Sequence, residues 1–160
     1  MRTILACAVA AMLAFSGAGR AQAQSAPTGL VFGGVGGFSD HGQAVYQVGA
    51  GFQRLWEPGV GVVAEIGYVA RFDGPGEGIG LLSANAIYAF RGSRARSRAR
   101  PFVTGGYGMA FEEVAIHLAN IGAGVDWSLG RVAWRIEVRD HFMLGDNGHF
   151  FQVRTGLVWQ

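Results

Sequence analysis

The 160-residue chain has no lysine, a single cysteine, and no apolar run beyond its N-terminal region that is long enough for a spanning helix. The missing lysine excludes a GxxxxGK phosphate-binding loop, because that lysine contacts the phosphates. The single cysteine excludes a disulfide scaffold within the chain. GxGxxG and HExxH motifs are also absent, so neither a Rossmann-type dinucleotide site nor a zinc-protease site of that kind is indicated.

The N-terminus has the parts of a secretory signal peptide. The apolar run Ile4–Phe15 follows Arg2 and precedes the stretch AQAQS, in which Ala21 and Ala23 fit the small-residue positions of a cleavage site. Cys7 lies inside the apolar run, too near the start for a lipoprotein cysteine. The sequence therefore predicts a signal peptide over residues 1–23, followed by one domain over residues 24–160.

Cleavage at that point changes the balance of charge. It removes two of the thirteen arginines and leaves eleven, against eleven acidic residues. The predicted mature chain is therefore near neutral and free of cysteine, which also excludes a thiolate metal site and a cysteine nucleophile.

Beyond Pro27 the sequence alternates between apolar and polar residues in segments of about ten residues, separated by turn signals. The stretches EPG, DGPGEG and GDNG are typical turns, and Gly130-Arg131 fits a two-residue hairpin. The sequence of the connection Glu112–His117 is also compatible with a short helical turn. Eight strands are predicted: Thr28–Phe38, Gln43–Leu55, Val60–Phe72, Ile79–Phe90, Phe102–Phe111, Leu118–Leu129, Val132–Phe142 and Phe150–Trp159.

Each predicted strand has one apolar and one polar face, as in RVAWRIEVRDHF, where Trp134 and Ile136 alternate with Arg135 and Glu137. Alternation alone fits either a soluble lipocalin-like barrel or an inverted barrel with its apolar face outside. The polar face is rich in glycine and poor in charge, while the apolar face carries aromatic residues at strand ends, as a membrane girdle requires. The prediction is an all-β, eight-stranded antiparallel up-and-down transmembrane β-barrel, with a narrow lumen filled by polar side chains.

The whole of the predicted mature chain resembles small outer-membrane β-barrel proteins of Gram-negative bacteria, including the eight-stranded domain of outer-membrane protein A. The signal peptide, the eight strands, and the stretches RPFVTGGYG and RIEVRDH carry this resemblance. The last strand, FFQVRTGLVWQ, resembles the recognition signal of the barrel-assembly machinery, although it ends in Gln160 where the family usually ends in Phe or Trp. The resemblance implies the cell outer membrane as location, reached by export through the periplasm. It also implies a monomer that contacts outer-membrane lipids and lipopolysaccharide.

The candidate site is a set of charges on the polar face. The two-residue hairpin places Asp126 opposite Arg135, and a turn near Gly145 places Glu137 opposite Arg154. These charges form either a structural plug of ion pairs or, by the resemblance, a gate whose pairs exchange to open a small pore. The predicted lumen charge cluster consists of Glu65, Arg71, Asp126, Arg135, Glu137, Arg139 and Arg154.

Other motifs support weaker hypotheses. The arginine-rich stretch Arg91–Arg100 has no aromatic residue for base stacking, so a solvated periplasmic loop is favoured and nucleic-acid binding is not expected. A lipid A deacylase requires a His-x-Ser motif, whereas His141 is followed by Phe142 and Met143. No enzyme and no cofactor are therefore expected.

The four histidines are predicted near the connections at one end of the barrel, together with several carboxylates. Imidazole and carboxylate groups can bind a metal ion, but no local motif fixes their spacing. A metal site is therefore the alternative to a solvated rim. The histidines are His41, His117, His141 and His149.

The sequence therefore predicts a barrel of the outer membrane with a structural or minor-pore role. A lipid-modifying enzyme of the outer membrane and a soluble secreted barrel for an apolar ligand remain the alternatives.

Overall fold

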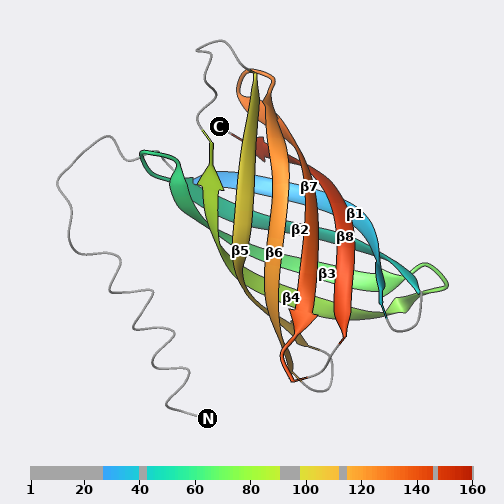
Figure 1. The fold of residues 1–160 in the computed structure, drawn as a ribbon. Coiled ribbons are helices and arrows are strands. Elements are labelled where there is room, and N and C mark those ends of the chain that lie inside the picture. Colours follow the sequence, from blue (N-terminus) through green and yellow to red (C-terminus); the bar gives the residue numbers. More distant parts are fainter. Residues whose placement is uncertain (1–26, 40–42, 91–97, 112–114, 146–147, 160) are drawn as a thin grey trace.

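The computed structural model describes residues 27–39, 43–90, 98–111, 115–145 and 148–159. These residues form one closed antiparallel barrel in which every strand pairs with its neighbours in sequence and β1 pairs with β8 (Figure 1). The strands are β1 Thr28–Phe38, β2 Ala44–Leu55, β3 Val60–Arg71, β4 Gly74–Ala89, β5 Ala99–Phe111, β6 Ala115–Ser128, β7 Val132–Met143 and β8 His149–Trp159.

Because the barrel has eight up-and-down strands, both ends of the strand sequence lie at the same end of the barrel. The terminal end holds the start of β1, the end of β8 and the turns at 56–59 and 129–131 (Figure 1). The far end holds the turn at 72–73 and the connection that follows β7. None of the described residues forms a helix long and apolar enough to cross a membrane.

The predicted hairpin at Gly130-Arg131 is confirmed. The amide of Leu129 donates to the carbonyl of Val132 over 2.8 Å, and Gly130 has a φ of 95°. That conformation suits glycine, because a Cβ would be strained there. The turn fixes the register, so Trp127 lies opposite Trp134 as predicted.

Three strand boundaries differ from the predictions by three residues or more. β4 begins at Gly74 and not at Ile79, so the glycine-rich stretch after β3 extends the sheet and only a tight turn at 72–73 remains. β5 begins at Ala99, before the predicted Phe102. β6 begins at Ala115, which corrects the option of a helical turn there, since pairing with β5 supplies the backbone hydrogen bonds. The earlier part of that option, 112–114, lies outside the described residues.

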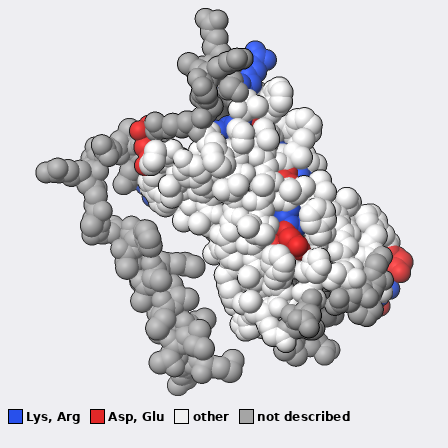
Figure 2. Space-filling view, in the orientation of Figure 1, with Lys and Arg blue, Asp and Glu red and all other residues white. Residues whose placement is uncertain are grey.

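The outer wall is apolar and the lumen is polar at mid-height. Large hydrophobic side chains point outward from every strand, with Phe52 at 68 % exposed and Ile121 at 61 % exposed. In the face that Figure 2 shows, charged residues are few and uncharged surface predominates. The soluble alternative needs the reverse arrangement and is therefore contradicted by this packing.

Candidate functional site in the barrel lumen

Four buried charges of alternating sign form a closed ring at the middle of the lumen. Glu65 comes from β3, Glu137 and Arg139 from β7, and Arg154 from β8. Arg154 Nη2 lies 2.7 Å from Glu65 Oε1 and 2.6 Å from Glu137 Oε2. Arg139 Nε donates to Glu137 Oε1 over 2.8 Å, and Arg139 also pairs with Glu65. Each arginine therefore bridges both glutamates, and the ring carries no net charge.

Hydroxyl and amide groups complete the hydrogen bonding of the two glutamates. Ser83 Oγ donates to Glu65 Oε2 over 3.0 Å, and Thr104 Oγ1 donates to Glu137 Oε1 over 3.2 Å. Asn85 Nδ2 donates to Ser83 Oγ over 3.2 Å. This support matters because buried ion pairs are stable only where the remaining lone pairs are also satisfied.

A second charged unit lies on the terminal side of the ring. Arg135 forms a bidentate pair with Asp126, with Nε to Oδ1 at 2.7 Å and Nη2 to Oδ2 at 2.8 Å. Arg135 Nη2 also donates to Gln53 Oε1 over 2.8 Å, which links β7 to β2 across the lumen. The guanidinium stacks over Phe102 at 4.3 Å from the ring centre. The structure thus pairs Asp126 with Arg135, as the hairpin predicted.

Glycine provides the space for these long side chains. A Cβ on Gly122 would lie 2.8 Å from both Glu137 Oε1 and Thr104 Oγ1. A Cβ on Gly34 would lie 2.6 Å from the carbonyl oxygen of Val153 and 3.1 Å from Arg154 Cγ. The 2.6 and 2.8 Å distances are shorter than real Cβ contacts, so a larger residue would press on Glu137 and Thr104 at position 122 and on the β8 backbone at position 34.

Two apolar clusters enclose the charged residues from above and below. The first occupies the terminal half of the lumen and the second occupies the far half. The first consists of Leu30, Phe32, Val63, Ile87, Ala89, Phe102, Ala133 and Val158. The second consists of Val45, Val69, Leu81, Ala110, Leu118 and Phe150.

Sequence reasoning missed both clusters. It treated the inward face as polar throughout, although Ala133 shares the register of Arg135 and Val158 shares that of Arg154. Following that register to the ends of each strand would have found them. A cavity next to Arg135, Glu137 and Arg154 measures about 10 Å³, room for about one water molecule.

Arg71 was wrongly assigned to the lumen cluster. Its side chain is 42 % exposed at the far end, where Nε pairs with Asp73 Oδ1 at 2.9 Å. A register irregularity between Val69 and Arg71 interrupts the alternation on which the assignment relied. The hydrogen bond from Arg71 lowers the pKa of the Asp73 carboxyl below its ordinary value, and desolvation opposes this effect without outweighing it.

The described histidines do not converge on a metal site. His141 is buried in the lumen, as its inward register predicts, with Nε2 2.7 Å from Gln152 Nε2, so it does not join the other histidines on the rim. His149 lies 3.2 Å from Asp140 Oδ1, and His117 contacts Tyr107. Within the described residues no three metal-ligating side chains come together. His41 lies outside the described residues.

The arginine-rich stretch is described only in its last part. Arg98 and Arg100 are exposed at the terminal end, where the carbonyl of Arg98 accepts a hydrogen bond from Ser128 over 2.8 Å. Residues 91–97, which hold the other arginines of this stretch, lie outside the described residues.

The architecture is that of an eight-stranded outer-membrane-type β-barrel, and solved structures share it. Neisserial surface protein A matches with a TM-score of 0.63 and 12 % identity, over 86 % of this chain and 99 % of that one. The N-terminal β-barrel domain of OprF from Pseudomonas aeruginosa matches with a TM-score of 0.63 and 18 % identity, over 86 % and 100 %. The outer membrane enzyme PagL matches with a TM-score of 0.55 and 17 % identity, over 79 % and 97 %.

No protein family model matches the sequence, and no curated protein matches it. At these identities the likeness to solved structures defines the fold: the chain is an eight-stranded antiparallel barrel of the kind that outer-membrane proteins form.

Proposed function

We propose that this protein is an integral, monomeric barrel of the bacterial outer membrane with a structural role, and that its lumen is closed to solutes. The observation that carries the proposal is the buried ring of Glu65, Glu137, Arg139 and Arg154 between two apolar clusters. Polar side chains alone would leave a path for water. Apolar packing on both sides of the ring removes that path.

The outer wall supports the membrane location. The 11-residue strands β1 and β8 extend about 36 Å at about 3.3 Å per residue. A tilt of about 45° reduces this to about 25 Å along the barrel axis, which equals the apolar band of known outer-membrane barrels. Tyr88 and Trp159 expose aromatic rings near one end of this band, and Tyr107 does so nearer the other.

In this proposal the terminal end faces the periplasm and the far end faces outward. The outward apolar side chains of β8 are Phe151, Val153, Leu157 and Trp159. Their apolar alternation supports recognition of β8 by the barrel-assembly machinery during export. The lipid partners are then outer-membrane phospholipid around the wall and lipopolysaccharide at the far end.

A minor pore is the second candidate, and one contact favours it. Arg154 bonds Glu65 and Glu137 at once, so it can lose one partner and keep the other while the ring rearranges. Opening would also require the apolar clusters to separate, which the hydrophobic effect opposes. The closed role is therefore the stronger proposal.

The full chain, refolded in detergent and inserted into a planar bilayer, tests the closed role. We expect no steady conductance from the wild type. A variant in which Phe102, Phe150 and Arg154 are all replaced by alanine should conduct, because it removes material from both clusters and the ring. Steady channels from the wild type would overturn the closed role and favour the minor pore.

Two simpler measurements test the membrane assignment and the expectation that the protein is not an enzyme. The folded barrel should need detergent for solubility and should migrate differently on gels before and after heating. Expression should leave the mass of lipid A unchanged, since Met143 stands where a deacylase of this kind needs serine and His141 is buried. A change in that mass would contradict the non-enzymatic role.

A further inference from the structure

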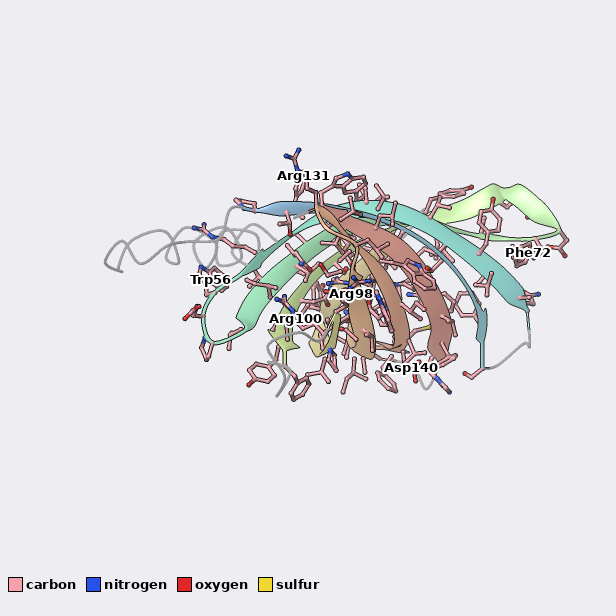
Figure 3. All side chains as sticks on the ribbon, turned by 90° about the horizontal axis from the view of Figure 1, so that it is seen from above. Trp56, Phe72, Arg98, Arg100, Arg131 and Asp140 are labelled. Atoms are coloured by element: carbon pink, nitrogen blue, oxygen red, sulfur yellow. The ribbon has the colours of Figure 1, made fainter. Side chains whose placement is uncertain are left out.

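The outer wall carries a carboxylate among apolar side chains. Asp140 on β7 lies opposite Ile121 on β6 and Phe151 on β8, which are 61 % and 48 % exposed on the wall. Residues that lie opposite each other on neighbouring strands point to the same face of a sheet, so the Asp140 side chain points outward. Figure 3 accordingly places Asp140 at the outer edge of the barrel. The other carboxylates of the described ranges point into the lumen or lie near one of the two ends.

Asp140 lies below the far end, within the apolar band of the wall. Val138 on the same strand pairs with Val153, the neighbour of Arg154 in the ring. Two residues advance a strand by about 7 Å, so Asp140 lies about that far along β7 beyond the level of the ring. The strand then continues to Met143. In the proposed membrane location the carboxylate therefore faces lipid tails, where an ionisable residue is costly and marks a site with a specific partner.

The chain itself provides one partner for this carboxylate. His149 Nδ1 lies 3.2 Å from Asp140 Oδ1, and the His149 ring stacks on Phe142 with 6.1 Å between the ring centres. Ser39 holds the backbone of His149: its amide donates to the His149 carbonyl over 3.0 Å, and its Oγ accepts from the His149 amide over 3.3 Å. The Asp140 side chain is nevertheless 24 % exposed. A carboxylate has about four acceptor positions, so Asp140 can accept further hydrogen bonds from outside the chain.

A groove in the outer wall begins beside this pair. It measures about 630 Å³, its exposed surface is almost entirely apolar, and it extends from Asp140 to Tyr88 near the terminal end of β4. Ala86 on β4 lies opposite Gly105 on β5. Gly105 in turn lies opposite Ile121, which pairs with Asp140. Because Ala86 and Gly105 are small, this row of the wall is hollow, and it ends at the carboxylate.

The groove and the carboxylate together define the chemistry of an occupant. A hydrocarbon chain fits an apolar groove that faces the membrane, whereas the carboxylate needs hydrogen-bond donors where lipid tails offer none. An occupant that satisfies both has an N–H or O–H group next to the start of its acyl chain. An ester linkage without such a group offers only acceptors, which a carboxylate cannot use. Lipopolysaccharide, the outward lipid of the proposed function, has amide-linked and hydroxylated acyl chains of the required kind.

We propose that this groove holds an acyl chain of lipopolysaccharide, whose amide or hydroxyl group donates a hydrogen bond to Asp140. This inference rests on the proposed function, because it requires the far end to face outward. The polar end of the groove lies toward the far end, so the chain enters from that side and runs toward Tyr88. His149 fixes the carboxylate, and the small residues admit the chain. A hydrogen bond of this kind within a membrane contributes about threefold to binding.

The test uses the full chain folded in detergent, with native mass spectrometry to count bound lipid. Sphingomyelin and phosphatidylcholine are matched probes: they share a headgroup, and only sphingomyelin has an N–H and an O–H beside its chains. We expect the wild type to retain lipid A, the lipid part of lipopolysaccharide, and to retain sphingomyelin about threefold better than phosphatidylcholine. Asp140→Leu should lose this preference and keep its binding of phosphatidylcholine, because only the acceptor is removed.

Two further variants separate the groove from the rest of the wall. Ala123 lines the groove, whereas Ala50 points outward from β2, which contributes no lining residue. Ala123→Leu fills part of the groove and should weaken the retention of both sphingomyelin and lipid A. Ala50→Leu adds the same side chain elsewhere on the wall and should leave their retention unchanged.

Several results would overturn the proposed site. Equal retention of the matched probes by the wild type, or a preference that survives in Asp140→Leu, would do so while insertion into phosphatidylcholine vesicles stays intact. Absence of lipid A binding would overturn the assignment to lipopolysaccharide. An equal loss in Ala123→Leu and Ala50→Leu would overturn the groove, and a lipid-free dimer that Ala123→Leu dissociates would place a second copy there instead. Failure of the wild type to insert into any vesicle would overturn this inference and the proposed function together.

Discussion

Arg154 on β8 contacts Glu65 on β3 at 2.7 Å, although 89 positions separate them in sequence and the two strands are not neighbours in the barrel. The contact crosses the lumen and joins opposite sides of the wall. It also shares Arg154 with Glu137. The stability of the barrel should therefore depend on the ring as a unit.

Replacement of one ring member should leave another charge buried without its partner. For Glu137→Ala we expect a loss of about 3–5 kcal/mol in the free energy of unfolding, because Arg139 and Arg154 then share Glu65 alone. The double variant with Arg154→Ala restores neutrality and should recover part of the loss. Urea unfolding from lipid vesicles measures both. Simple additivity of the two single changes would contradict the coupling.

The space beside the ring should be as critical as its charges. Gly122→Ala places a Cβ 2.8 Å from Glu137 Oε1 and should cost about 1–3 kcal/mol. Gly105→Ala is the matched control, since the nearest atom to its Cβ, the carbonyl oxygen of Asn120, is 3.6 Å away. Thermal unfolding of the two variants in the same detergent compares them. Equal melting temperatures would show that the ring tolerates the added methyl group.

A cation on the wall should be costly at mid-height and tolerated at the end. Val153, next to Arg154, is 44 % exposed at the level of the ring, and Leu129 is 62 % exposed at the terminal turn. Val153→Arg should lose about 2–4 kcal/mol of stability in a bilayer, and Leu129→Arg about 0–1 kcal/mol. Folding yield into vesicles, followed by gel mobility, distinguishes them. If Val153→Arg folds as well as Leu129→Arg, the wall does not face lipid.

A hydrogen bond on the apolar wall gives a further prediction. Trp134 Nε1 donates to Thr155 Oγ1 over 2.7 Å, where lipid would offer no replacement partner. Thr155→Val and Trp134→Phe should be coupled by about 0.6 kcal/mol and at most about 1.7 kcal/mol, the mean and the maximum for hydrogen bonds between membrane helices. A double-mutant cycle in vesicles measures the coupling. A value of zero would place this part of the wall in water.

The alternation of apolar and polar residues and the turn residues of the hairpins were sufficient to predict the outer wall and the contacts between adjacent strands. The turn at Gly130 fixed Asp126 opposite Arg135, and the pairing of Glu137 with Arg154 followed from the next connection. The period of two placed Trp134, Tyr88 and Leu157 outward, and all three are exposed. These relations depend only on neighbours in sequence, which a single chain displays directly.

Contacts across the lumen could not be obtained in the same way. Arg139 and Arg154 both reach Glu65 because of the stagger of the strands in the closed barrel. The alternation of apolar and polar residues does not specify that stagger. The assignment of Arg71 to the lumen was wrong for a local reason: the register irregularity after Val69 ends the strict alternation before the strand ends. The period of two predicted the inward position of His141, which is buried, and only its grouping with the rim histidines was wrong.

The last strand also bears on how the barrel can fold. β8 closes the sheet against β1 and supplies a side chain at successive heights of the lumen: Phe150 to the far cluster, Gln152 beside His141, Arg154 to the ring and Val158 to the terminal cluster. Without β8, Glu65 and Glu137 would each lose an arginine, and both apolar clusters would be open. No smaller set of strands has a complete interior, so intermediates should gain little stability until the ends of the sheet meet. Folding is therefore expected to be cooperative and slow, limited by pairing between the most distant parts of the sequence.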